Sequence, residues 1–130
     1  MKYTLLTFAL LLTALVGLNA QARLGVSFAE IKAEFSDPVF NFRTKFDDDG
    51  ELLVYIDTDR ATVLYDFDDE KYCVATGIFP DNQGALNTFV EHYNNQYVII
   101  SNTEWKMYSA NGISTIKLHF TDTGYFFVWE

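Results

Sequence analysis

The sequence predicts an α+β fold in which a helix is followed by antiparallel strands, twice over. Two stretches carry apolar residues at helical spacing, and eight short runs alternate apolar and polar residues between turn-forming Asp, Asn and Gly. Four of these runs follow each helix. We therefore expect one curved antiparallel sheet of seven or eight strands, with two helices packed on one of its faces.

The first helix is predicted to begin at Ser27, because Ser27 and Glu30 have the spacing of a capping box. Asp37-Pro38 ends this helix, since proline cannot continue it. The apolar residues on one helical face are Phe28, Ile31 and Phe35. Acidic turns then separate four predicted strands, in residues 39–46, 52–56, 62–67 and 72–79.

The second helix follows Pro80, and its apolar residues recur at positions 86, 89, 90 and 93. Asn111-Gly112 is typical of a type I′ hairpin turn, because both central residues of that turn need a positive φ. The C-terminal strand is a candidate edge at which two copies could pair. Four strands are predicted after this helix, in residues 97–101, 105–110, 113–120 and 125–129.

The two strand blocks resemble each other when the chain is shifted by about 53 positions. A duplicated half-domain, with halves 23–79 and 80–130, explains this match. The alternative is that any two hairpins with alternating apolar residues match equally well. The matched residues are Thr62, Val63, Phe67, Asp69 and Tyr72 with Thr115, Ile116, Phe120, Asp122 and Tyr125.

Residues 1–22 have the features of a signal peptide: Lys2, an apolar run from Leu5 to Leu18, and the small-residue site Ala20-Gln21-Ala22. We expect cleavage near Gln21 or Arg23 and an exported bacterial protein, periplasmic or extracellular, with a single domain in residues 23–130. No later run has the length of a membrane span.

The chain is acidic, with 9 Lys and Arg against 18 Asp and Glu and a net charge of −9. Nucleic acid and anionic membranes are therefore poor partners, whereas basic protein surfaces or cations are better ones. The simpler alternative is that the carboxylates keep the domain soluble. We interpret the acidic segments 47–51 and 66–70 as hairpin turns rather than cation sites, because they lack the alternating ligand spacing of a calcium loop.

No catalytic motif, metal site or cofactor site is evident in the sequence. Cys73 is the only cysteine, and we expect it to be a small buried hydrophobe rather than a nucleophile. A nucleophile needs a nearby imidazole. Both candidates, His92 and His119, are predicted to face solvent. We therefore expect a protein that is not an enzyme.

Aromatic residues are abundant, with 12 Phe, 8 Tyr and 2 Trp. Such side chains supply large contact areas at low entropic cost, so we expect a face that binds another exported or envelope protein. One alternative is burial on both sides of the sheet; another is a pocket of roughly 300 Å³ or more in a small-molecule or lipid carrier. The predicted contact residues are Trp105, Tyr108, Tyr125, Phe127 and Trp129.

The segment Leu24-Gly25-Val26-Ser27-Phe28-Ala29-Glu30-Ile31, followed by Phe35-Ser36-Asp37-Pro38, resembles the start of small exported bacterial α/β modules. These are the outer-membrane assembly proteins of the SmpA/OmlA type and the β-lactamase inhibitor protein. The resemblance covers about fourteen residues and implies a helix pair on an antiparallel sheet that binds other proteins. This chain lacks the lipidated cysteine of the first group and the disulfides of the second.

Overall fold

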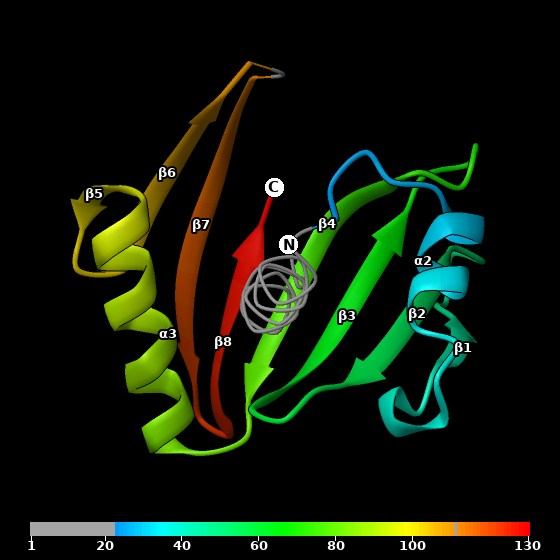
Figure 1. Cartoon of the computed structure of the whole chain (residues 1–130), viewed down its shortest axis with the longest axis horizontal. Helices are drawn as coiled ribbons and strands as arrows, with labels where there is room; N and C mark the ends of the chain where they lie inside the picture. Colours follow the sequence, from blue (N-terminus) through cyan, green and yellow to red (C-terminus); the bar gives the residue numbers. More distant parts are fainter. Residues whose placement is uncertain (1–22, 111) are drawn as a thin grey trace, which may run out of the picture.

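The computed structural model describes residues 23–110 and 112–130. The predicted signal peptide and Asn111 of the predicted hairpin lie outside the described residues. The first helix and its strands are α2 (Phe28–Glu34), the 3-10 turn η1 (Pro38–Phe40), β1 (Arg43–Phe46), β2 (Leu52–Asp57), β3 (Ala61–Phe67) and β4 (Cys73–Pro80). They are followed by α3 (Gln83–Gln96), β5 (Val98–Ser101), β6 (Glu104–Ser109), β7 (Gly112–Thr121) and β8 (Gly124–Trp129) (Figure 1).

The eight strands form one antiparallel sheet in the order β1-β2-β3-β4-β8-β7-β6-β5. Each half of the chain therefore contributes four consecutive neighbours, and β4 and β8 join the halves at the centre. This mirrored order is what a duplication would produce, although common ancestry of the halves stays a prediction. The C-terminal strand β8 is central, so the prediction that it is an exposed edge is wrong; within the described chain the edges are β1 and β5.

The predicted α+β class is also wrong. Most of the regular structure in residues 23–110 and 112–130 is strand: an open, eight-stranded antiparallel sheet accompanied by α-helices of 7 and 14 residues. The helical stretches are short because turn chemistry interrupts them, whereas β7 alone runs for 10 residues. The described part of the chain is a sheet with two helices, rather than a fold with balanced helical and sheet layers.

Both helices begin where a polar side chain caps them. The Ser27 hydroxyl accepts a hydrogen bond from the Glu30 N–H at 3.2 Å, and the Asn82 side-chain carbonyl accepts one from the Ala85 N–H at 2.8 Å. The N–H of Asp81 donates to the Arg60 carbonyl at 2.8 Å, which ties the start of α3 to the β2–β3 turn of the first half.

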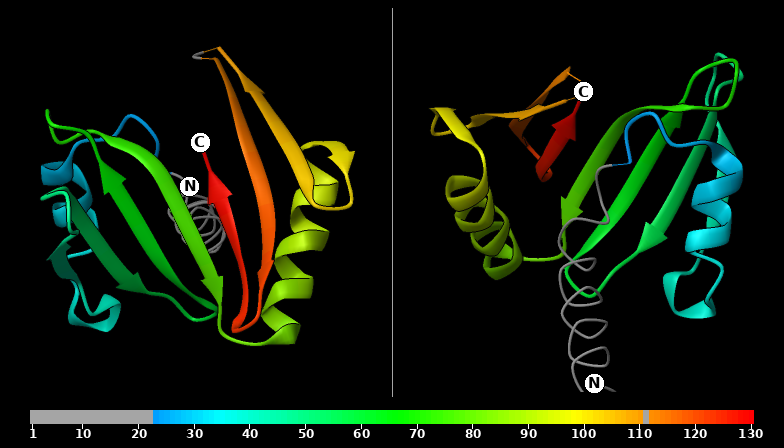
Figure 2. Two further views of the ribbon diagram at one scale, coloured as in Figure 1. Left: turned by 180° about the vertical axis from the view of Figure 1, so that it is seen from behind. Right: turned by 45° about the horizontal axis from the view of Figure 1, so that its top comes forward.

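Strand register shows that both helices pack on the same face of the sheet, which we call the helix face. Residues directly opposite in neighbouring strands share a face. Ring contacts place Phe35 of α2 on Tyr65 and Tyr93 of α3 on Trp105. One row across this face is Tyr65, Thr76, Trp129, Ile116 and Trp105. Each helix covers a different half of the sheet (Figures 1 and 2).

The predicted strand over residues 39–46 is shorter than expected. Asp37 caps η1 through its carboxylate, which accepts from the Val39 N–H at 3.0 Å, and Asn41 then takes a left-handed conformation with φ 47°. Pro38 fixes the first φ of this turn. Local turn chemistry therefore delays β1 until Arg43.

Neither helix in the described residues is long and apolar enough to cross a membrane.

Candidate functional site

Three of the five predicted contact residues lie in the core. Trp105, Phe127 and Trp129 are buried on the helix face, and Tyr125 is half-buried on the same face. Only Tyr108 is exposed, at 58% of its surface, close to the tip of the β6–β7 hairpin. The five residues therefore do not form a continuous accessible surface.

The buried tryptophans hold α3 on the sheet. Tyr93 of α3 makes edge contacts with the rings of Trp105 and Trp129 at 5.6 and 5.7 Å between centroids. The Trp105 indole N–H donates to the Asn94 side chain at 2.8 Å, and that of Trp129 donates to the Tyr93 hydroxyl at 3.3 Å. Burial raises the pKa of Tyr93, so its hydroxyl stays protonated at neutral pH. The two indole N–H groups and the Tyr93 hydroxyl therefore form hydrogen bonds within the protein.

The opposite side of the sheet, which we call the open face, carries the exposed side chains of Phe79 and Tyr108. Neither helix packs against it in the described structure, and Figure 2 shows the central strands uncovered when seen from behind. One row across it is Arg43, Tyr55, Leu64, Gly77, Val128, Lys117 and Glu104. A second row is Thr62, Phe79, Phe126 and His119.

Three stacked rings lie at the centre of the open face. Phe79 stacks on Phe126 at 5.4 Å between centroids, and Phe126 stacks on His119 at 5.1 Å. The Phe79 ring also covers Gly77, where an added Cβ would meet that ring at 3.3 Å. A glycine therefore lets the ring lie flat on the sheet. The stack forms an aromatic platform that crosses strands from both halves of the chain.

Paired charges lie at both ends of the first row of the open face. The Arg43 guanidinium lies over the Tyr55 ring at 5.5 Å and is 3.2 Å from the Asp57 carboxylate. A hydrogen bond from Asn41 and the contact with Arg43 lower the pKa of Asp57. Lys117 lies 3.8 Å from Glu104 at the other end. An apolar centre with a polar rim is the anatomy of protein-binding surfaces.

A cleft of about 510 Å³ lies beside the end of β8. It lies between residues 24–26, which precede α2, and residues 112–114 of β7. These residues of β7 extend beyond the last residue of β8. Apolar side chains and small residues line it together: Leu24, Gly25, Val26, Met107, Ser109, Gly112, Ile113, Ser114 and Trp129. Its volume exceeds the roughly 300 Å³ that small-molecule sites require.

Cys73 is buried on the helix face, and its thiol lies 3.4 Å from the Ala75 carbonyl and 3.6 Å from the Thr76 hydroxyl. Burial raises the pKa of this thiol, which keeps it protonated and a poor nucleophile. His119 lies on the open face, exposed as predicted. His92 is half-buried against the rings of Tyr93 and Tyr97, rather than fully solvent-facing, and its burial lowers its pKa.

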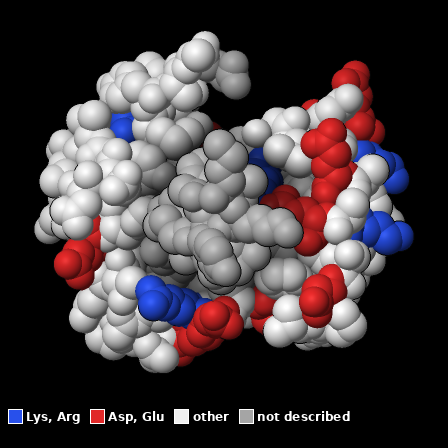
Figure 3. All heavy atoms as spheres, in the orientation of Figure 1, with Lys and Arg blue, Asp and Glu red and all other residues white. Residues whose placement is uncertain are grey.

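Acidic side chains gather over the half that contains α2 and β1–β3 (Figure 3). The neighbouring carboxylates of Asp66 and Asp47 raise the pKa of Glu51. The pKa of Asp66 is also raised, mainly by its burial and to a lesser extent by the negative charge of Asp47. Asp66 Oδ1 is buried and has no hydrogen-bond partner in the described structure. Among the described residues, no group of three or more His, Cys, Asp or Glu side chains is arranged to hold a metal ion.

The alternation of residues along β8 shows that both faces of the sheet are apolar, but it does not show which face the helices cover. Phe126 and Val128 alternate with Phe127 and Trp129, so both faces of β8 are apolar. The helices cover the face with the larger rings, and the choice depends on packing across the whole sheet.

A comparison of the chain with known protein families, curated proteins and solved structures finds no match.

Proposed function

We propose that this chain is an exported, non-catalytic protein-binding module whose contact surface is the open face. The observation that carries the proposal is the uncovered row of stacked rings formed by Phe79, Phe126 and His119. In an antiparallel sheet with one face in solvent, the residues that point to that face are normally polar. Here Leu64 and Val128 extend the apolar centre instead.

The surrounding charges favour a protein partner over a lipid surface or nucleic acid. Arg43 pairs with Asp57 and Lys117 pairs with Glu104, so the rim of the open face has both signs and no excess of cations. Polar rims of this kind orient a protein partner, whereas anionic lipids and phosphates need concentrated positive charge. The acidic balance of the chain also favours a partner with a basic surface.

A pull-down from the exported fraction of the source cell tests this proposal. Phe79→Glu places a charge in the centre of the open face, and Val39→Glu makes the same kind of change at an exposed site away from it. Circular dichroism first shows that both variants fold. We expect a partner that binds the wild type and Val39→Glu but not Phe79→Glu. A partner retained equally by both variants would place the contact surface elsewhere.

The cleft supports a second candidate function, that of a small-molecule or lipid carrier. Met107, Ile113 and Trp129 give this cleft apolar surface, and Ser109 and Ser114 add hydroxyl groups, so it suits a ligand with both apolar and polar groups. Native mass spectrometry of the purified protein distinguishes the two functions. A bound small molecule that Met107→Lys removes would favour the carrier, whereas a ligand-free protein that retains a protein partner would favour the binding module.

A further inference from the structure

The outer strand β5 presents an apolar edge. Within the described residues it pairs only with β6, and Figure 1 shows it at the margin of the sheet. Val98, Ile99 and Ile100 are exposed at 50%, 55% and 48% of their surfaces. Three consecutive exposed β-branched residues on an edge strand are a template for pairing with another strand.

The backbone of this edge is available for hydrogen bonding. Thr115 of β7 exchanges both of its backbone hydrogen bonds with Glu130, at 2.8 and 3.0 Å, so its polar groups point away from β6. The residue of β6 that lies opposite Thr115 is Lys106. The backbone N–H and C=O of Lys106 therefore point toward Val98 of β5. These groups alternate along a regular strand, and the register with β6 is regular from Val98 to Ile99 and shifts only after Ile99, so the N–H and C=O of Ile99 point outward from the sheet.

The two edges of the sheet differ in how they are protected. The β1 edge carries Arg43 and Lys45, and positive charges on an edge discourage strand pairing. The β5 edge has no protection by charge, because residues 94–103 include no charged side chain, and its register with β6 is irregular only beyond Ile99. Two copies of a chain with a net charge of −9 repel each other, and an uncharged edge is where they can meet with the least repulsion.

We propose that β5 pairs antiparallel with β5 of a second copy of this chain, about a two-fold axis beside Ile99. Each Ile99 N–H then donates to the Ile99 carbonyl of the other copy, and Val98 lies opposite Ile100. A two-fold contact is self-complementary, as this short apolar segment allows. The sheets of the two copies become continuous. A strand edge of four residues covers far less than the roughly 800 Å² per partner of a standard interface, so this dimer dissociates on dilution.

Sedimentation velocity of the purified protein over a concentration series tests the proposal. Ile99→Lys places two positive charges face to face, and we expect it to weaken dimerisation by about tenfold or more. Val39→Lys makes the same change at an exposed site far from β5 and leaves dimerisation unchanged. A monomer at every concentration, or a dimer that Ile99→Lys does not weaken, would overturn the proposal.

Cross-linking provides a second test that does not depend on the lysine variant. Opposed residues in an antiparallel pair have Cα atoms about 5.5 Å apart, within the range of a disulfide. Ile99→Cys should therefore form a disulfide dimer on mild oxidation, well above the level of Val39→Cys, while buried Cys73 does not react. Equal cross-linking of the two variants would also overturn the proposal. Phe79→Glu on the open face should dimerise like the wild type, which separates this inference from the proposed function.

Discussion

The two halves of the molecule have the same order of elements but hold their helices differently. α2 has 7 residues and buries only Ile31, whereas α3 has 14 and buries Ala85, Leu86, Phe89 and Tyr93. A seven-residue helix is unstable in isolation, so α2 depends on the residues around it. The difference shows that one chain pattern can dock a helix in two physically distinct ways.

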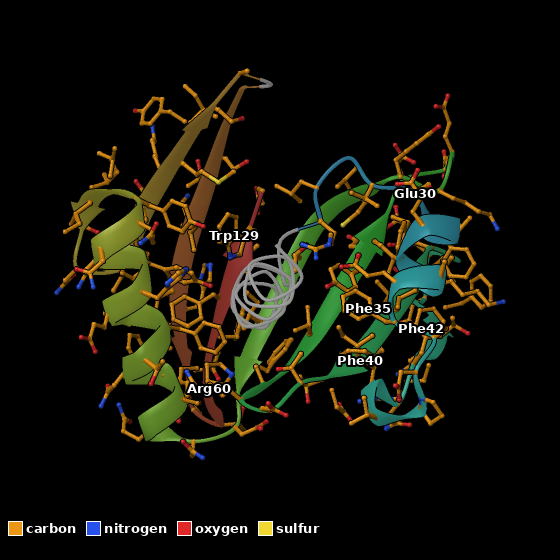
Figure 4. The ribbon with its side chains drawn as sticks, in the orientation of Figure 1. Glu30, Phe35, Phe40, Phe42, Arg60 and Trp129 are labelled. Atoms are coloured by element: carbon orange, nitrogen blue, oxygen red, sulfur yellow. The ribbon has the colours of Figure 1, made fainter. Side chains whose placement is uncertain are left out.

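The first half uses phenylalanine rings and flanking contacts. Phe35, which follows α2, packs against Phe40 at 5.0 Å between centroids, and Phe28 packs on Phe67 at 5.8 Å. Phe35, Phe40 and Phe42 lie together beside α2 in Figure 4. The Arg23 side chain donates to Glu34 at 2.9 Å and so ties the entering segment to the end of this helix.

The second half uses tyrosine and tryptophan, whose polar tips bond to each other or to the helix. Tyr93 contacts Trp105 and Trp129 and accepts a hydrogen bond from Trp129. Such rings add directional bonds to apolar burial. The position of α3 is therefore fixed by hydrogen bonds from buried rings, whereas α2 is held mainly by ring packing and by the Arg23–Glu34 contact at its end.

The largest expected effect is the loss of a buried ring. Trp105→Ala should lower the free energy of unfolding by about 3–5 kcal/mol, because it leaves a cavity beneath α3. Phe35→Ala should cost a similar amount in the first half. Urea denaturation measures both. Tyr108→Ala, at an exposed position on the same strand as Trp105, should change stability by less than about 0.5 kcal/mol. A Trp105→Ala variant as stable as Tyr108→Ala would contradict the core position of Trp105.

A smaller effect isolates the hydrogen bond that distinguishes the second half. Tyr93→Phe keeps the ring but leaves the buried Trp129 indole N–H without its acceptor, which should cost about 1–3 kcal/mol. Chemical denaturation and near-ultraviolet circular dichroism of the tryptophans measure the change. Unchanged stability would show that this hydrogen bond does not help to hold α3 on the sheet.

Removal of each helix cap compares the two halves directly. Ser27→Ala and Asn82→Ala each delete the side-chain acceptor at a helix N-terminus and should each cost about 1 kcal/mol. Hydrogen exchange then shows where the loss is felt. We expect Ser27→Ala to expose the amides of all of α2, whereas Asn82→Ala should affect only the first turn of the longer α3. Equal, local exchange in both variants would refute this difference.

The smallest expected effect concerns the acidic first half. The pKa of Asp66 is raised in the folded protein, so its ionised form opposes folding, and stability falls as pH rises from the unfolded pKa through the folded one. Asp66→Asn should therefore stabilise the protein at pH 7, by less than about 1 kcal/mol because Asp66 is only partly buried and solvent screens the rest of its carboxylate. The gain should disappear as pH falls below about 4. Thermal unfolding at the two pH values measures it, and Asp122→Asn in the second half serves as the control for the charge change.

Equivalent positions in the sequence pattern do not have equivalent environments. Val63 and Ile116 match under the 53-residue shift, and both are fully buried. Phe67 and Phe120 also match, yet Phe67 is buried under Phe28 and Phe120 is exposed at the end of β7. The pattern predicts which residues are apolar, but the reach of the helix above each strand decides which of them are covered.

The sequence by itself determined the local features: the order of helices and strands, the Ser27 cap and the hairpin turns. These depend on neighbouring residues, on capping spacing and on turn chemistry. Only the tertiary structure decided that the sheet outweighs the helices, that β8 lies at its centre, and that Trp105, Phe127 and Trp129 lie on the helix face. Strand order and the choice between two apolar faces depend on contacts between distant residues, and alternation along one strand looks the same whichever face is covered.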